Sequence, residues 1–209
     1  TTRGTTVSVI DLTTNIVSDS IAVGSNPTTA AVNTVTNEVY VANSQSNSVS
    51  VINASTNAVS SVTVGNGPKA MDINPVSNTI YAVNQTDGTV SVIDGTTAAV
   101  SATMTVGADP QAVAVNPVTN SIYVANTGGT SVSVIDGSTN SVSATVTVGA
   151  TPNAVAINLS TNTIYVANYG SGMVSAINGA TNVATSVPVG TDPNAVTVNP
   201  LTNTIYVAN

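Results

Sequence analysis

The sequence contains no cysteine and no histidine, and charged residues make up only 5% of the chain. Without cysteine it can form no disulfide, so its fold depends on its own core. A chain of 209 residues can bury about 70% of its unfolded surface, which is enough for a single stable domain. Ser, Thr and Asn fill most polar positions in place of charges. This manner of solvation predicts an extracellular or cell-surface location.

Basic side chains are almost absent. Arg3 and Lys69 stand against nine acidic residues, which gives a formal net charge of −7. Binding of nucleic acid depends on neutralising phosphates with Lys and Arg, and an anionic membrane surface is disfavoured for the same reason. No run approaches the 18 or so apolar residues of a membrane-spanning helix. We therefore expect neither nucleic acid as a partner nor insertion into a membrane.

The same shortages bear on catalysis. With no histidine, no cysteine and one glutamate, Glu38, the chain offers no base–nucleophile set that spacing can assemble. We predict a non-enzymatic protein with no catalytic residues, no metal and no cofactor; chemistry based on aspartate stays open as an alternative. A weaker alternative is Ca²⁺, which Asp109 and Asp192 could help to hold together with carbonyls and water.

The sequence is built from one repeated unit. The tetrad Tyr-Val-Ala-Asn, or a near copy of it, recurs every 41 or 42 residues and begins at Tyr40, Tyr81, Tyr123, Tyr165 and Tyr206. A fixed period in this range is typical of repeat architectures. The period of two within each unit and the abundance of Val, Ile and Thr favour strands over helices.

Each repeat contains four short segments separated by turn signals such as Asn-Pro-Val-Thr-Asn. In the central copy the segments are Gln111–Asn116, Ser121–Asn126, Ser131–Asp136 and Ser141–Gly149. The first two are apolar throughout and the last alternates with Ser and Thr, so polarity rises from first to fourth. A radial four-stranded sheet buries its inner strands and leaves its outermost strand half in water. The pattern predicts β-propeller blades, with the first strand buried on both faces.

The two ends of the chain each carry half of a blade. Third and fourth segments lie at Val7–Asp11 and Asn15–Gly24, and first and second segments lie at Asn194–Asn199 and Thr204–Asn209. We predict an all-β, five-bladed β-propeller over residues 1–209, with one blade completed by the N-terminal outer strands and the C-terminal inner strands. The same distribution of strands at the two ends would also fit a fragment of a longer repeat array, or a blade completed between two chains.

The successive motifs Ile-Tyr-Val-Ala-Asn, Ser-Val-Ser-Val-Ile-Asp, Val-Thr-Val-Gly and Pro-x-Ala-Val-Ala-Val-Asn-Pro resemble the YVTN family of β-propeller repeats over the whole chain. The resemblance implies the propeller fold and an association with surface-layer and other cell-surface proteins. A related propeller occurs in virginiamycin B lyase, but that activity would require a catalytic histidine, which this chain lacks. A lyase is therefore a disfavoured alternative.

Several polar and aromatic positions repeat, and each has a structural interpretation. The tyrosines of the tetrads fit packing between blades better than a ring of binding sites, with each hydroxyl meeting a polar partner. Aspartate and asparagine exchange at one position before a tight turn, which favours capping of that turn through the side chain; these residues are Asp11, Asn53, Asp94, Asp136 and Asn178.

Departures from the repeat supply the candidate ligand-binding residues. Asp72 replaces the Ala or Thr of the other blades on an inner strand, where a carboxylate must be paired, hydrogen-bonded or protonated. We interpret it first as a polar group bonded to a neighbouring blade and alternatively as a ligand contact. The other candidates lie in loops or at a strand entrance and are Lys69, Asp87, Asp109, Tyr169 and Asp192.

The predicted outer strands indicate which surface of the molecule contacts its partners. Asn57–Gly65, Thr97–Gly107 and Asn140–Gly149 carry no charge, whereas Asp19 and Pro188 interrupt the other two. Edge strands normally carry Lys, Pro or bulges that prevent pairing with another molecule. We therefore predict self-association, or packing with other surface proteins, by a structural and adhesive scaffold.

Glycans enter the prediction in two ways. Asn53, Asn84 and Asn158 each begin an Asn-x-Ser/Thr sequon and are candidate acceptors. The runner-up function is a lectin-like propeller that binds sugars through loop Asn, Asp and Tyr. Such a binder should carry similar polar loops in several blades, yet Gln85–Thr89, Thr127–Ser131 and Tyr169–Met173 differ markedly.

Overall fold

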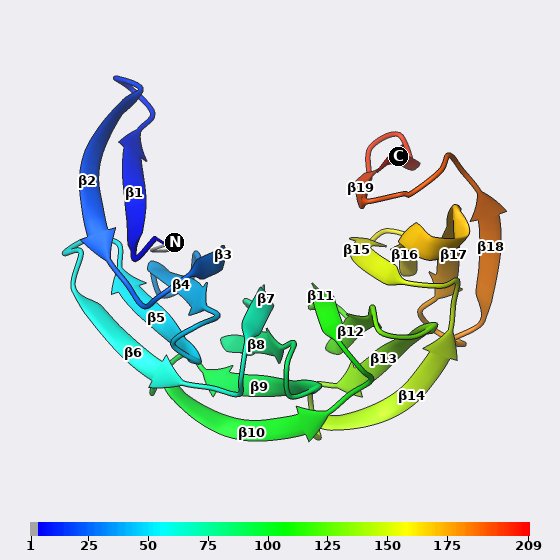
Figure 1. Cartoon of the computed structure of the whole chain (residues 1–209), viewed down its shortest axis with the longest axis horizontal. Coiled ribbons are helices and arrows are strands. Elements are labelled where there is room, and N and C mark those ends of the chain that lie inside the picture. Colours follow the sequence, from blue (N-terminus) through cyan, green and yellow to red (C-terminus); the bar gives the residue numbers. More distant parts are fainter. Residues whose placement is uncertain (1–3) are drawn as a thin grey trace.

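The computed structural model describes residues 4–209, which form six antiparallel sheets arranged in an open arc (Figure 1). Four of the sheets have four strands each, and we call them the first to fourth blades. A two-stranded sheet stands at each end of the arc, and we call these the N-terminal and C-terminal half-blades. None of the helices in residues 4–209 has both the length and the apolar character that crossing a membrane requires.

The strands follow one another in chain order within each sheet. The N-terminal half-blade contains β1 (Thr6–Asp11) and β2 (Ile16–Ala22). The first blade contains β3 (Pro27–Asn33), β4 (Glu38–Asn43), β5 (Ser48–Asn53) and β6 (Val59–Thr63), and the second contains β7 (Pro68–Asn74), β8 (Thr79–Asn84), β9 (Thr89–Asp94) and β10 (Ala99–Thr105).

The remaining elements repeat the same plan. The third blade contains β11 (Pro110–Asn116), β12 (Ser121–Asn126), β13 (Ser131–Asp136) and β14 (Ser141–Thr147). The fourth contains β15 (Pro152–Asn158), β16 (Thr163–Asn168), the short 3₁₀ turn η1 (Tyr169–Ser171), β17 (Met173–Asn178) and β18 (Ala184–Pro188), and the C-terminal half-blade contains β19 (Ala195–Asn199) and β20 (Thr204–Ala208). First strands lie along the concave side of the arc and fourth strands along its convex side (Figure 1).

The four-stranded repeat is confirmed, but the predicted five-bladed ring is wrong for this structure. The half-blades form separate two-stranded sheets, and β20 does not pair with β1. In Figure 1 they lie on opposite sides of a gap. The rotation from one blade to the next depends on the side chains packed between the two sheets. With the rotation that this packing produces, the repeats do not complete a ring and the arc stays open. The predicted pairing between the N-terminal and C-terminal strands is not formed in residues 4–209.

The predicted decrease in burial from first strand to fourth is also only partly right. The second and third strands are the most buried, as in β8 and β9, whereas β15 is mostly half-buried and β7 mixes buried, half-buried and exposed residues. First strands line the open concave side, so only their flanks are covered. Fourth strands are mostly exposed, as predicted for the outer edge.

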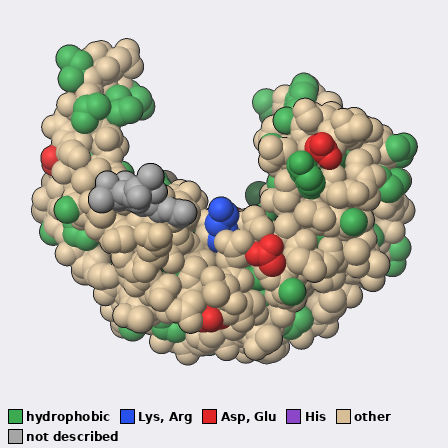
Figure 2. Space-filling view, in the orientation of Figure 1, with side chains coloured by type: hydrophobic (Ala, Val, Ile, Leu, Met, Phe, Trp, Pro, Cys, Tyr) green, Lys and Arg blue, Asp and Glu red, His purple; other side chains and the backbone are tan. Residues whose placement is uncertain are grey.

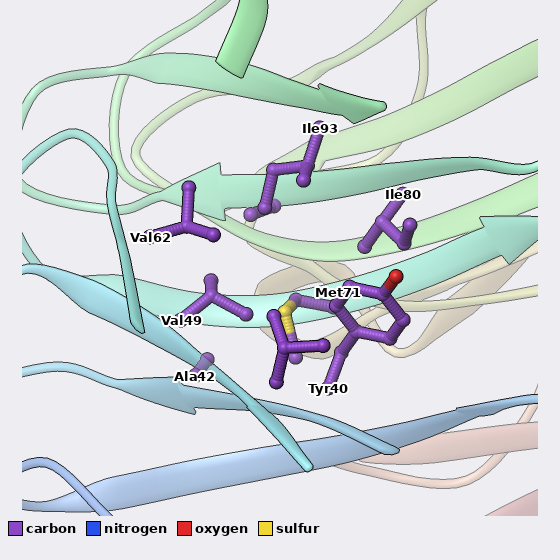
Figure 3. Packing of buried hydrophobic residues seen from close by; sticks show 9 residues of the cluster. Tyr40, Ala42, Val49, Val62, Met71, Ile80 and Ile93 are labelled. Carbon is purple, nitrogen blue, oxygen red and sulfur yellow. The ribbon is translucent and has the colours of Figure 1, made fainter. Parts of the chain in front are cut away.

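Hydrophobic side chains between successive blades form the core. Between the first and second blades, Tyr40 and Val49 pack in one cluster with Met71, Ile80 and Ile93 (Figure 3). The two isoleucines and Tyr40 are fully buried. Burial of an aliphatic side chain of this size contributes about 1.5–3 kcal/mol. The core is thus a series of layers between sheets, repeated along the arc.

The tyrosines confirm packing between blades where both neighbours are present. Tyr40, Tyr81 and Tyr123 are fully buried, whereas Tyr206 in the C-terminal half-blade is 60% exposed. The hydroxyl of Tyr40 donates to Oε2 of Glu38 at 2.9 Å. The prediction that every hydroxyl has a polar partner is wrong, because Tyr81 and Tyr123 have no hydrogen-bond partner in residues 4–209.

Asparagines join each blade to the next. In each of the four complete blades, the asparagine that ends the first strand donates from Nδ2 to Oδ1 of the turn asparagine one blade further along. The pairs are Asn33–Asn78 (2.6 Å), Asn74–Asn120 (2.7 Å), Asn116–Asn162 (2.8 Å) and Asn158–Asn203 (2.7 Å). Each donor residue is 99% buried, and its Oδ1 accepts a backbone N–H of its own turn. We call these contacts the interblade asparagine pairs.

Candidate functional site

Asp72 bridges the second and third blades. Its Oδ2 accepts the backbone N–H of Val115 on β11 at 2.7 Å, and its Oδ1 accepts that of Ile73 at 2.8 Å. Burial raises the pKa of Asp72, and the two N–H donors oppose that rise. The geometry agrees with the interpretation of Asp72 as a polar group bonded to a neighbouring blade. Each oxygen accepts one backbone donor, so the carboxylate is held between its own strand and the next blade; a ligand contact by Asp72 stays a prediction.

Lys69 lies three residues earlier on the same strand, β7, and is exposed. The register of β7 against β8 shifts between Pro68 and Ala70, so Lys69 lies at an irregularity that interrupts the regular alternation of faces. In Figure 2, basic side-chain atoms appear in the hollow of the arc with one acidic group beside them, and the other visible acidic groups lie at separate places on this face. This face therefore shows no cluster of several acidic groups around the basic one.

Loop carboxylates fasten neighbouring blades to one another. Asp87 accepts the backbone N–H of Asn66 at 2.7 Å and its side-chain amide at 2.9 Å. The backbone bond, followed by the side-chain bond, lowers the pKa of Asp87. Asp109 accepts from the amides of Gln85 at 2.7 Å and Gln111 at 3.0 Å. Both candidates therefore join the loops of successive blades.

Tyr169 and Asp192 lie in loops near the C-terminal end of the arc. Tyr169 begins η1 and is 41% exposed. Asp192 is exposed and adopts a left-handed backbone conformation with φ of 55°. Within residues 4–209, no group of three or more Asp, Glu, His or Cys side chains is placed to hold a metal ion. Two carboxylates joined by carbonyls and water form a different kind of site, so Ca²⁺ binding by Asp109 and Asp192 stays a prediction.

Two of the three candidate glycan acceptors are wrong for the folded chain. Asn84 is fully buried, and its Nδ2 donates to the hydroxyls of Thr89 and Ser91. Asn158 is 1% exposed, and its Nδ2 is held in an interblade asparagine pair. A glycan needs this nitrogen at the surface, and a sequon gives no information on burial. Asn53 is exposed, and its glycosylation stays a prediction.

The turn-capping interpretation is confirmed. Oδ1 of Asp94 accepts the backbone N–H groups of Thr96 and Thr97 at 2.8 and 3.0 Å, and these bonds lower the pKa of Asp94. Asn53 and Asn178 make the same pair of bonds without a charge. The carboxylate at this position therefore serves the turn, as the exchange of Asp and Asn predicts.

Sequence reasoning missed the partner of the repeated Val-Gly motif. A Cβ added to Gly107, after the fourth strand of one blade, would lie 2.4 Å from Cγ of Asn126 in the next blade. The N–H of Gly107 donates to Oδ1 of Asn126, whose Nδ2 donates to Ser131 and Ser133. Gly24, Gly65, Gly149 and Gly190 approach an asparagine in the same way. The constant spacing of these Gly and Asn residues was the signal available in the sequence.

The largest open hollows lie on the surface between strands. One of about 470 Å³ lies between the outer strands β6 and β10 and is lined largely by Thr63, Thr89, Ser91, Thr103 and Asp87. It is shallow and its lining is mixed, with Val64 and Val100 beside the hydroxyl side chains, and its carboxylate already bonds Asn66. The hollow has no pair of groups that suggests a reaction.

Comparisons with known proteins agree with this architecture. Residues 93–193, just under half of the chain, match the family model described as "Lactonase, 7-bladed beta-propeller". A chain from the solved structure of Kuenenia stuttgartiensis hydrazine synthase superposes with a TM-score of 0.65 at 16% identity, covering 99% of this chain and 90% of that one. The chain is a β-propeller repeat protein. No curated protein matches it, and the two likenesses show fold, not activity.

Proposed function

We propose that this β-propeller repeat protein is a non-enzymatic structural and adhesive module of an extracellular or cell surface, which self-associates into a layer or filament. The observation that carries the proposal is the convex side of the arc. Three consecutive blades end there in the uncharged strands β6, β10 and β14, which leave one edge of backbone N–H and C=O groups unpaired by any strand of residues 4–209. Such edges pair readily with another chain.

The side chains of these strands suit contact with a similar surface. Exposed Ser and Thr alternate with half-buried or buried Val, Ala and Met along most of β10 and the second half of β14, where Val142 is exposed as well. Hydroxyl rows of this kind can form cross-strand hydrogen bonds without desolvating a charge. The interblade asparagine pairs join the first strand of each complete blade to the next sheet, so they tie successive blades to one another. The resemblance to surface-layer YVTN repeats points in the same direction.

The name of the matching family model raises lactone hydrolysis as a competing activity. That name describes other members of the family, and the match spans only residues 93–193. The carboxylates of this chain, Asp72, Asp87 and Asp109 among them, accept hydrogen bonds that hold blades together. A structural role therefore accounts for them, and we propose no reaction.

Edge lysines test the proposal. Ser61, Thr103 and Thr145 are exposed residues of β6, β10 and β14, and their joint replacement by lysine places a charge on each edge. We expect the wild-type chain to form assemblies at millimolar concentration and the triple variant to lose lateral contacts. The matched control places three lysines at the exposed turn positions Thr14, Thr97 and Thr202. Equal light scattering by the triple variant and the wild type would refute the proposed edges.

A further inference from the structure

The hollow between β6 and β10, which we call the rim hollow, lies between two complete blades. One wall consists of Thr63 at the end of β6 and the two residues after it, and the other comes from β9, β10 and the loop before β9. Its volume of about 470 Å³ lies within the range of small-molecule sites, about 300–1,000 Å³. The rim hollow therefore has the size of a site for a small ligand.

One charged side chain of the described residues, Asp87, lines the rim hollow. The equivalent loop position holds Ser46 in the first blade, Gly129 in the third and Ser171 in the fourth, so the carboxylate departs from the repeat. Its oxygens accept the backbone N–H of Asn66 at 2.7 Å and the side-chain amide at 2.9 Å. A carboxylate has about four acceptor sites, so about two stay available for O–H donors of a ligand.

Two hydroxyls in the rim hollow are oriented to donate. Nδ2 of Asn84 donates to Oγ1 of Thr89 at 3.0 Å and to Oγ of Ser91 at 2.9 Å. Asn84 is fully buried, so it holds both oxygens in place. Each hydroxyl accepts a proton from the amide, and neither donates to another group of residues 4–209. The rim hollow thus combines an oriented acceptor with hydroxyl protons that still lack a partner.

We propose that the rim hollow binds a neutral saccharide. Neighbouring hydroxyls of a sugar donate to one carboxylate and accept from protein hydroxyls, which complements Asp87, Thr89 and Ser91. Val64 and Val100 supply apolar contacts for the C–H groups of the ring. The ionised carboxylate and the absence of a basic side chain from the described lining disfavour an anionic ligand. The inference goes beyond the proposed self-association and names a ligand for the adhesive module.

A single site agrees with the differences between the loops of the blades. A lectin that binds through every blade needs similar polar loops, whereas the rim hollow depends on Asp87, which has no counterpart among the equivalent loop positions of the other complete blades. The rim hollow is also shallow, so it covers one side of a sugar and leaves the other in water. We therefore expect binding in the millimolar range.

Titration with methyl glycosides, followed by the backbone amide signals in NMR, tests the inference. The probes are the methyl glycosides of glucose, galactose, mannose and N-acetylglucosamine, with butylammonium chloride as a cationic comparison. The protein is kept below the concentration at which light scattering detects assembly. We expect a saturable shift of the signals of Thr89, Ser91 and Thr103 with at least one glycoside. Absence of such a shift with every glycoside, or a shift with butylammonium alone, would overturn the inference.

A matched pair of valine variants locates the site. Thr103 lines the rim hollow and pairs with Ser91, whereas Thr145 pairs with Ser133 at the equivalent place of the third blade. Both threonines are exposed, and valine keeps their shape while removing the hydroxyl. Thr103→Val should weaken glycoside binding about threefold or more, as expected for one lost hydrogen bond. Thr145→Val should leave it unchanged, and equal binding by the two variants would place the sugar elsewhere and overturn the inference.

Asp87→Asn tests the carboxylate. The substitution removes the charge and keeps one oxygen that accepts from Asn66, so the loop contact between the blades is partly retained. Glycoside binding should weaken about tenfold or more, because hydrogen bonds to a charged group are the stronger kind. Amide signals away from the rim hollow report whether the fold is intact. A folded Asp87→Asn chain that binds as tightly as wild type would overturn the role of Asp87.

This inference and the proposed function fail separately. Assembly of the wild-type chain without a glycoside shift overturns saccharide binding and leaves the lateral contacts standing. A glycoside shift that Thr103→Val weakens, in a chain that stays monomeric at millimolar concentration, overturns the proposed self-association and supports the rim hollow.

Discussion

The substitution Asn116→Asp tests whether the interblade asparagine pairs hold the arc together. Asn116 is 1% exposed; its Oδ1 accepts the N–H of Val118 at 3.0 Å, and its Nδ2 donates to Oδ1 of Asn162 at 2.8 Å. Aspartate has nearly the same shape and keeps the acceptor for Val118. It replaces the interblade donor with a carboxylate oxygen, so that two acceptors face each other between the third and fourth blades.

The expected loss has two parts. The missing hydrogen bond removes about 1 kcal/mol, and a buried acceptor left without a donor costs a further 1–3 kcal/mol or so. The free energy of unfolding near pH 7 should therefore fall by about 2–4 kcal/mol, a large share of the about 5–15 kcal/mol typical of a folded domain. Urea titration followed by circular dichroism measures this loss.

The pH dependence of the loss separates this explanation from a general packing defect. Burial next to Asn162 should raise the pKa of the new carboxyl above that of an unfolded aspartate, near 3.9. A raised folded-state pKa gives stability at low pH that is lost as pH rises through it. Once protonated, the carboxyl can again donate to Asn162, so the difference from wild type should shrink near pH 4.

Asn199→Asp is the matched control. Asn199 caps the same turn through bonds from Leu201 and Thr202, but it lies in the C-terminal half-blade, beyond which residues 4–209 supply no further blade. We expect a change below about 0.5 kcal/mol, as for an ordinary surface substitution. A loss at Asn116 no larger than at Asn199, or one that does not depend on pH, would refute the reasoning.

Three further predictions follow from the repeated contacts. Gly107→Ala should cost about 1–3 kcal/mol in urea titration because its Cβ overlaps Asn126; the control Gly129→Ala, whose nearest atom would be 3.9 Å away, should cost less. The Tm of Asp72→Ala, measured relative to that of wild type, should be higher at neutral pH than at acid pH. The reason is that burial raises the pKa of Asp72, so its ionised form destabilises the fold. Thermal melts with the opposite trend would contradict this. The backbone bonds that lower the pKa of Asp94 stabilise the fold above about pH 4, and this contribution is lost as pH falls further. Asp94→Asn should therefore lose less Tm on acidification than wild type does. An equal loss of Tm in the two proteins would count against the capping role.

The fold of each blade could be predicted from sequence because its determinants are local. Alternation of Val with Ser or Thr, together with the repeated Asn-Pro turns, placed the strands of the third blade within two residues of their observed bounds. The same holds for the caps at Asp94 and Asn53, since the atoms that bond are separated by two or three residues.

Contacts between blades could not be predicted in the same way. The bond from Asn116 reaches a residue 46 positions away, and the repeat gives every blade the same asparagines without showing which pairs meet. Closure of the ring depends on the rotation between blades, to which many packed side chains contribute, so counting repeats did not determine it. Asp72 was the exception, because its departure from the repeat indicated a contact with a neighbouring blade.

Electron cryo-microscopy of the assembled wild-type protein tests the central claim most directly. The account predicts arcs of rigid blades that contact one another through β6, β10 and β14. Dispersed single particles at high concentration, or an assembly whose contacts avoid these convex edges, would contradict it.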